Sequence, residues 1–399
     1  MDGLASAPKA FWRGMIRKIE NKTDISKFDK NKLRLSMVVI KGLVLFLAIN
    51  LLFSAFGSSG LGTLSLYNHV FPGRLRLPFG ENPAKTYNFS LDNLDAMFAS
   101  HVVSGNAKTM GEYRVFIIGD SSTWGVLLKP EETLSGLLND DLLNCDGRFF
   151  NVYNLGYPTL SLTKDIMILD KAMQFKPDLI IWLVTLEAFP SDKQLTSPIV
   201  ANNLVDLRQI SERYDLQLGL VNRSVLPLNP YEKSILGQRR ALADLLRLQL
   251  YGAMWSATLI DQIYPSEYEQ AQIDLNNDLD FHNMAPPELK KEEIAINILA
   301  AGEKIAGEVP IILINEPILI SNGKNSDIRY NFYYPRWAYD QYRNILSDYS
   351  KVHSWKYLDY WDIVPMDEFT NSAIHLTPNG ENILAGYLIQ EIHNEVCPQ

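Results

Sequence analysis

Two segments of the sequence, about 250 residues apart, carry the residue types needed for nucleophilic catalysis. In the first, VFIIGDSSTWG (115–125), an apolar run ends in the small, hydroxyl-rich turn that contains Asp120, Ser121 and Ser122. A serine becomes a nucleophile only when a base, usually a histidine, can take its proton. The same turn could instead be purely structural, or its hydroxyls could cradle the phosphate of a nucleotide or flavin.

The second segment, FTNSAIHLTPNG (369–380), supplies the base. His375 follows the last predicted strand and precedes the last predicted helix, which Thr377 can cap and Pro378 can open. The carboxyl ends of parallel strands share one edge of a sheet, where ligands bind. His375 is therefore expected at the same edge as Ser121, which favours Ser121 as nucleophile, with Ser122 as the alternative.

The elements that must position these residues form an alternating pattern. Strands are expected in five apolar runs: YRVFIIGD (113–120), FFNVYNLG (149–156), DLIIWLVT (178–185), VPIILIN (309–315) and WKYLDY (355–360). Helices are expected in the amphipathic segments near 131–143, 160–174, 288–307, 335–351 and 378–394. Strands buried on both faces and separated by helices predict a doubly wound, five-stranded parallel α/β sheet.

The α/β domain is expected to span 113–399, with a helical insert at 190–308 that is too long for a simple crossover. Within the insert, QRRALADLLRLQLYGAMWSATLIDQI (238–263) is strongly helical. We expect the insert to lie over the carboxyl edge of the sheet. Its apolar face could pack on the sheet or contact a membrane or an integral-membrane partner.

The N-terminal region indicates a membrane anchor. Residues 36–57 are almost wholly apolar and long enough to span a bilayer as one helix. Residues 1–35 carry nine Lys and Arg against four Asp and Glu, which by the positive-inside bias predicts a cytoplasmic N-terminus and an extracytoplasmic C-terminal domain. Residues 58–112 read as a stalk and lead-in with one short helix near 91–100. A cleaved signal peptide is the competing interpretation.

Composition excludes some classes of function. The chain has 399 residues, is 47% hydrophobic and carries a net charge of −9, which argues against a nucleic-acid partner. Its two cysteines, Cys145 and Cys397, lack metal-ligand spacing, and whether they pair stays open. No metal and no cofactor are expected.

Together these motifs resemble the SGNH (GDSL-type) hydrolase superfamily. The resemblance is carried by Gly119-Asp120-Ser121-Ser122 after the first strand, Asn154-Leu155-Gly156 after the second, and His375 with Thr377-Pro378-Asn379-Gly380. It implies a flavodoxin-like α/β/α domain in which Ser121 is the nucleophile and His375 the general base. The resemblance also implies an oxyanion hole made by the backbone N–H groups of Ser121 and Gly156 and a side-chain donor.

Two positions depart from the family pattern. Glu187 stands where the family has a donor asparagine, and a buried, protonated carboxyl could donate there. Asn154 or Asn315 could supply the donor instead. The family's aspartate three residues before the histidine is Ser372 here, with Asn371 beside it, and either side chain could orient the ring of His375. Asp367 or Glu368 could instead reach the ring through a turn.

These observations predict a membrane-anchored, extracytoplasmic serine esterase or O-acyltransferase. The resemblance implies that its substrates are O-acyl (acetyl) esters of cell-surface carbohydrate, with an integral-membrane O-acyltransferase as a possible partner. The alternative is a catalytically silent SGNH-like protein that binds glycan or assists a membrane acyltransferase.

Overall fold

Five short apolar segments form one parallel sheet in the computed structural model, which describes residues 35–56, 62–79, 93–141, 147–215, 229–258, 262–353 and 355–396. The strands are β1 (Glu112–Ile118), β2 (Phe149–Asn154), β3 (Leu179–Val184), β4 (Ile311–Asn315) and β5 (Lys356–Asp359). Their order in the sheet is β2-β1-β3-β4-β5, and every neighbouring pair is parallel. The predicted α/β fold with a five-stranded parallel sheet is therefore confirmed.

Each helix predicted from the sequence is present, although the one expected near 288–307 begins only at Asn297, and several short helices occur that were not predicted. The helices are α2 (Leu35–Phe56), α3 (Leu94–Ser100), α4 (Val102–Gly105), α5 (Ser121–Trp124), α6 (Leu134–Asp141), α7 (Leu162–Ala172), α8 (Pro198–Asn202), α9 (Leu204–Tyr214), α10 (Arg239–Thr258), α11 (Asn297–Ala306), α12 (Arg336–Val352) and α13 (Pro378–Val396). Short 3₁₀ turns include η4 (Leu186–Ala188) and η5 (Ser191–Lys193). Thr377 caps α13, as predicted: its Oγ1 accepts a hydrogen bond from the Gly380 N–H at 3.1 Å.

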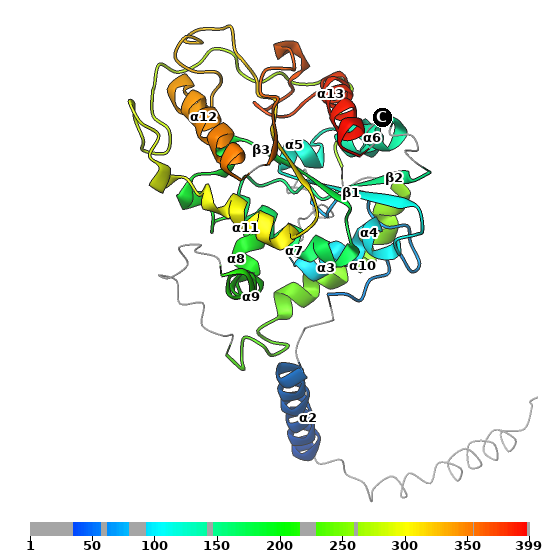
Figure 1. Cartoon of the computed structure of the whole chain (residues 1–399). Coiled ribbons are helices and arrows are strands. Elements are labelled where there is room, and N and C mark those ends of the chain that lie inside the picture. Colours follow the sequence, from blue (N-terminus) through cyan, green and yellow to red (C-terminus); the bar gives the residue numbers. More distant parts are fainter. Residues whose placement is uncertain are drawn as a thin grey trace, which may run out of the picture.

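Helices cover both faces of the sheet (Figure 1). Side chains of α6 and α13 form one buried core with the side of the sheet that carries Val115 and Ile181. Side chains of α3, α7, α11 and α12 form the other core, with Phe116 and Trp182. The strands β1 and β3 are buried along their whole length, which explains the continuous apolar sequence of β3 and of the second half of β1.

The described part of the predicted stalk and lead-in packs against the domain. Tyr67 and Leu77 are buried, and α3 buries Met97 and Phe98 in the core. The predicted helix near 91–100 is present as α3, with the Asn93 side chain as its N-cap. The chain before β1 is therefore part of the folded unit rather than a spacer.

The long insert does not lie over the carboxyl edge as one body. α10 packs on the lead-in: the Leu66 N–H donates to Gln249 Oε1 at 2.6 Å, and the Arg74 guanidinium lies over the Trp255 ring at 5.2 Å. The irregular part of the insert that follows does reach the carboxyl edge, where the Ala271 N–H donates to the Thr370 carbonyl at 2.7 Å. The predicted placement over the carboxyl edge is therefore wrong for α10, because the inner apolar face of this helix packs against the lead-in.

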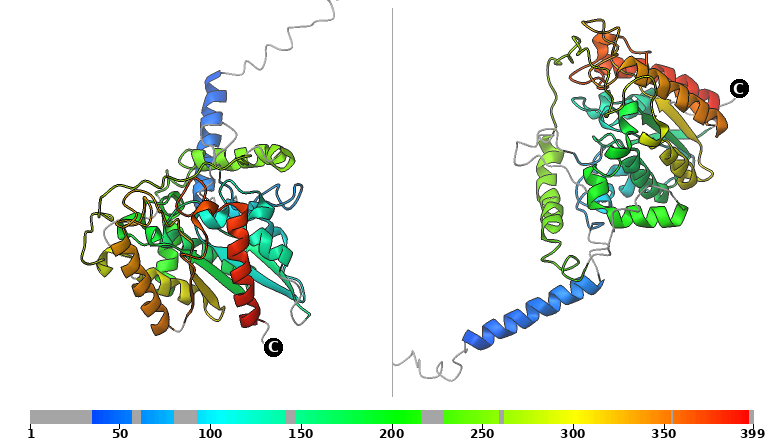
Figure 2. Two further views of the ribbon diagram at one scale, coloured as in Figure 1. Left: turned by 90° about the horizontal axis from the view of Figure 1, so that it is seen from above. Right: turned by 90° about the vertical axis from the view of Figure 1, so that its left-hand side faces the viewer.

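One helix among the described residues is long and apolar enough to cross a membrane. It is α2, whose residues Leu35–Ala55 have a mean hydropathy of 2.3 and are almost entirely exposed. In Figures 1 and 2, α2 projects away from the α/β domain. Cys145 and Cys397 lie outside the described residues.

Candidate active site

The serine turn is formed by the end of β1 and the start of α5. Asp120 is the N-cap of α5, and its Oδ1 accepts a hydrogen bond from the Ser122 N–H at 2.8 Å. Ser121 is the first residue of the helix, a position whose N–H has no acceptor within the helix. The Ser121 N–H can therefore donate to an oxygen placed outside the turn.

The structure brings Ser121 and His375 together. His375 Nε2 lies 2.8 Å from Ser121 Oγ, and His375 Nδ1 lies 2.9 Å from Asn371 Oδ1. An amide oxygen is an acceptor, so it holds the proton on Nδ1 and leaves Nε2 free to accept the serine proton. The loop that carries the ring is closed by the Thr370 N–H, which donates to the His375 carbonyl at 2.8 Å.

The environment keeps His375 uncharged. Burial lowers the pKa of His375 to about 4. Asn371 carries no charge, so it cannot stabilise an imidazolium as an aspartate would. At pH 7 the ring is thus in the form that accepts a proton, but it is a weak base.

Ser372 and Ser122 face other partners. Ser372, at the position of the family aspartate, hydrogen-bonds with the Tyr333 hydroxyl, so the structure does not use it to orient His375. Ser122 donates its hydroxyl hydrogen bond to Glu316 in the buried layer below the turn. Of the two serines, Ser121 is therefore the one aligned with the histidine.

The groups expected to donate hydrogen bonds in the oxyanion hole have other partners in the structure. The Gly156 N–H donates to Asn154 Oδ1 at 3.0 Å, and Asn154 Nδ2 donates to the Thr123 carbonyl at 2.7 Å. The Gly156 N–H is occupied and the buried Asn154 amide is directed to the Thr123 carbonyl, so the prediction that Gly156 and Asn154 form the oxyanion hole is not supported. Gly156 is instead required by packing, since a Cβ at this position would lie 2.5 Å from the backbone nitrogen of Trp124.

Asn315 is committed to the core. It is fully buried, its Nδ2 donates to Asp359 Oδ1 at 2.8 Å, and its Oδ1 accepts from the Tyr339 hydroxyl at 3.2 Å. Asn315 therefore links β4 to β5 and α12, and its prediction as an oxyanion donor is wrong.

Glu187 lies in η4 after β3 and is paired with Lys193 and His282. Its carboxylate accepts from Lys193 and lies 3.1 Å from His282 Nε2. Burial acts to raise its pKa, but the hydrogen bonds from His282 and Lys193 hold the pKa of Glu187 below its usual range. The carboxyl is therefore ionised, and a protonated Glu187 that donates to an oxyanion is excluded.

A buried ionic layer supports the serine turn from below. Lys164 is fully buried, donates to the Gly119 carbonyl at 2.6 Å and pairs with Asp165 at 2.6 Å. Burial and the nearby Asp120 carboxyl raise the pKa of Glu316 well above its usual range. Burial also raises the pKa of Asp120, against the opposing charge of Lys164. Sequence reasoning missed this layer, although Glu316 directly follows β4 in LINEP.

The lead-in also holds the turn in place. Arg76 donates to the Gly125 carbonyl at 2.7 Å, and its guanidinium lies over the Trp124 ring at 4.2 Å. The Trp124 Nε1–H donates to the Leu77 carbonyl at 2.8 Å. Gly125 ends α5 with φ +82°, a left-handed conformation that glycine adopts without strain. The Trp-Gly pair in the opening motif is thus explained by structure rather than by catalysis.

The pKa of the buried Glu381 leads to a prediction about the pH dependence of stability. Burial raises the pKa of Glu381 in α13 to about 8, so the folded chain keeps it protonated at pH 7 while the unfolded chain ionises it. Stability is therefore lost as pH rises from about 4.5 to about 8. Glu381→Gln should raise the free energy of unfolding by about 3 kcal/mol at pH 7 and leave it almost unchanged at pH 4.

Urea denaturation of the full chain at both pH values checks this prediction. Glu391→Gln, on the same helix in a surface ion pair with Lys356, is the matched control and should change stability little. Equal effects of the two variants at pH 7 would contradict the assignment of a buried, protonated Glu381.

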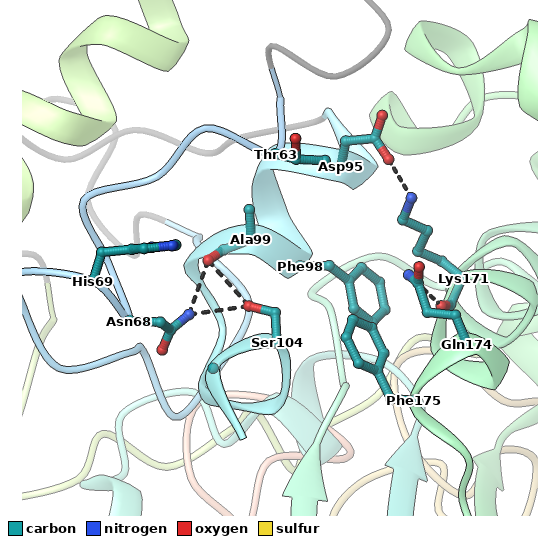
Figure 3. A pocket seen from close by; sticks show the side chains of 11 residues that line it. Thr63, Asn68, His69, Asp95, Phe98, Ala99, Ser104, Lys171, Gln174 and Phe175 are labelled. Carbon is teal, nitrogen blue, oxygen red and sulfur yellow. Dashed lines mark hydrogen bonds and ion pairs between the residues drawn. The ribbon is translucent and has the colours of Figure 1, made fainter. Parts of the chain in front are cut away.

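A cavity of about 370 Å³ lies elsewhere and shares no residue with the Ser121 site (Figure 3). Its polar groups satisfy one another. Asn68 donates to the Ala99 carbonyl and to Ser104, and Lys171 pairs with Asp95. The cavity offers no unpaired charge to a ligand, and we assign it no function.

Comparisons with known proteins give a likeness in fold. No protein-family model matches the chain, and no curated protein matches it in sequence. The solved structures to which it is similar include a member of the lipolytic G-D-S-L family from Veillonella parvula, at 11% identity and a TM-score of 0.33, over 71% of this chain and 99% of that one.

Two further structures are of esterases. Est24, a carbohydrate acetylesterase from Sinorhizobium meliloti, matches at 13% identity and a TM-score of 0.32, over 71% of this chain and 99% of that one. The aryl esterase of M. smegmatis matches at 12% identity and a TM-score of 0.33, over 70% and 98%. The descriptions name the class of hydrolase that the sequence motifs resemble. At these TM-scores, the functional conclusion rests on the geometry at Ser121.

Proposed function

We propose that this chain is a membrane-anchored, extracytoplasmic serine esterase or O-acyltransferase that acts on O-acyl esters of cell-surface carbohydrate. The observation that carries the proposal is the chain of hydrogen bonds from Ser121 Oγ to His375 Nε2 and from His375 Nδ1 to Asn371 Oδ1. A nucleophile, a base and a residue that orients the base are the geometric signature of acyl transfer through an acyl-enzyme.

The reaction follows from this arrangement. Ser121 Oγ attacks the ester carbonyl while His375 Nε2 takes the serine proton, and the Ser121 N–H stabilises the developing oxyanion. Collapse of the tetrahedral intermediate expels the alcohol, which receives the proton from His375. The acyl group stays on Ser121. Water or a sugar hydroxyl, deprotonated by His375, then takes the acyl group, and His375 returns the proton to Ser121 Oγ.

The test follows the acyl group. The full chain in detergent is incubated with p-nitrophenyl acetate, with and without an oligosaccharide acceptor. Mass spectrometry then measures whether the oligosaccharide has gained an acetyl group. Acetylated carbohydrate, the substrate class named for one of the solved structures above, is the next donor. Release of acetate alone defines an esterase, and acetylated oligosaccharide defines a transferase.

A second candidate is a catalytically silent SGNH-like protein that binds glycan or serves a membrane acyltransferase. It is favoured by the uncharged Asn371 and by the Gly156 N–H, which is occupied by Asn154. Absence of turnover on every ester, together with retained binding of acetylated oligosaccharide, would select this candidate.

The proposed orientation makes a further prediction. The excess of basic residues before α2 predicts that the C-terminal domain is outside the cytoplasmic membrane. Alkaline phosphatase fused after residue 399 should therefore be active, whereas a β-galactosidase fusion at the same place should not. The opposite pattern would reverse the orientation, and release of the fusion from the membrane would identify a cleaved signal peptide.

A further inference from the structure

The helix α10 is apolar on both of its faces, although only one face is covered. Its inner face buries Leu248 and Trp255 against the lead-in. Its outer face, read at helical spacing from Arg239, carries Ala243, Leu246 and Leu250. Leu246 is 59% exposed and Leu250 is 66% exposed. Exposed leucines on a helix whose other face is already packed on protein suit a contact with lipid or with another protein.

More exposed apolar side chains adjoin α10. On the turn that leads into it, Tyr231 and Leu236 are exposed, and the lead-in on which it packs exposes further residues, Leu64, Leu66, Val70 and Leu75. We call these side chains, with Leu246 and Leu250, the α10 surface. Groups of exposed apolar side chains of this kind can mark a contact site for a membrane or a protein.

The end of α2 lies against this surface. Ser54 Oγ donates to the Pro230 carbonyl at 2.9 Å, and the Leu236 N–H donates to Asn50 Oδ1 at 3.4 Å. Both views of Figure 2 show α10 beside the end of α2, lying across the face of the domain from which α2 emerges. A bilayer spanned by α2 would therefore meet the α10 surface directly.

The local charge also suits lipid headgroups. Residues 229–258 contain four basic side chains and two acidic ones, although acidic residues outnumber basic ones in the whole chain by 46 to 37. Arg239 and Arg240 are exposed at the start of α10. Basic residues that flank an exposed apolar stripe are typical of helices that lie in the plane of a membrane interface.

We propose that the α10 surface lies in the headgroup region of the bilayer that α2 spans and binds anionic lipid. The domain is then fixed at two places, by the span of α2 and by the surface contact of α10. The inference rests on the membrane anchor of the proposed function but not on its catalysis.

Lipid-facing labels test the proposal in the full chain. On a Cys145→Ser, Cys397→Ser background, single cysteines replace Leu246, Leu250, Leu45 in α2 or the exposed Tyr387 in α13, and each carries an environment-sensitive fluorophore. The chain is placed in nanodiscs of phosphatidylcholine and phosphatidylglycerol that contain nitroxide-labelled lipid. We expect quenching at 45, 246 and 250 that exceeds quenching at 387 by roughly threefold or more.

The control positions separate the possible failures. Quenching at 45 without quenching at 246 and 250 would overturn the docking of α10 while it leaves the anchor intact. No quenching at 45 would overturn both, because α2 would not be in the bilayer. A label at 246 that is shielded without lipid quenching would show a protein partner or a second copy and would also overturn the proposal.

A second measurement uses the unmodified chain. Photoactivatable phosphatidylcholine in the same discs should attach to peptides from α2 and from residues 229–258, and not to peptides from α13. Attachment to α2 alone would contradict the proposal.

Discussion

Replacing Ser121 with alanine is expected to lower kcat/KM for an activated ester by at least ~10³-fold, because it removes the atom that attacks the carbonyl. The matched variant, Ser122→Ala, removes a neighbouring hydroxyl that faces Glu316 instead of His375. It should keep most of the activity. Stopped-flow or steady-state hydrolysis of p-nitrophenyl acetate by both variants measures the difference.

His375→Ala should reduce activity by a similar factor, since the serine then lacks its base. The double variant Ser121→Ala, His375→Ala should be hardly worse than either single variant, because the two side chains act as one unit. Losses that simply multiply would show two independent structural effects and would contradict a Ser–His pair.

The second large effect concerns the residue that orients the histidine. With the pKa of His375 held at about 4 by burial, kcat/KM should rise with pH through about 4 and stay level above it. Asn371→Asp places a negative charge 2.9 Å from Nδ1 and should raise the pKa of His375. The rise in kcat/KM should move to higher pH, and the plateau should increase roughly tenfold because the base is stronger.

Two further variants isolate this contact. Asn371→Leu removes the acceptor at Nδ1 and should lower kcat/KM roughly 10²-fold or more without a matching change in stability. Ser372→Ala is the control, because Ser372 hydrogen-bonds with Tyr333 and not with His375. If the pH dependence of kcat/KM is the same in Asn371→Asp as in the wild type, Asn371 does not influence the pKa of His375.

Local sequence was enough to predict much of the fold. The strands β1, β3 and β4 are mainly apolar, and the helices between the strands have clear amphipathic spacing, so the fold class and the order of elements along the chain followed from periodicity. The meeting of Ser121 with His375 was also predictable, because both follow strand ends that share one edge of a parallel sheet.

The supporting groups could not be placed in the same way. The contact of Asn371 rather than Ser372 with the ring depends on the path of a short loop, which spacing alone does not determine. Asn154 and Asn315 are each the last residue of a strand, yet each donates its amide inward, to Thr123 and Asp359 respectively. These choices depend on contacts between segments far apart in the chain, on which single-sequence patterns carry no information.

The packing of the lead-in on the domain could not be predicted for a similar reason. Its glycines and prolines are typical of a linker, but Arg76 and Leu77 hold the end of α5, and Tyr67 is buried. The same holds for α10, whose apolar pattern is equally compatible with a core helix and with an interfacial one. Burial of each face was needed to tell the two apart.

The most direct test of the central claim is the site of covalent modification. A fluorophosphonate reacts preferentially with a serine that has been activated as a nucleophile, so the full chain should gain one phosphonyl group. Peptide mapping should place that group on Ser121, and His375→Ala should abolish it while Ser122→Ala keeps it. An adduct on any other residue, or no adduct on a folded chain, would contradict Ser121 as the nucleophile.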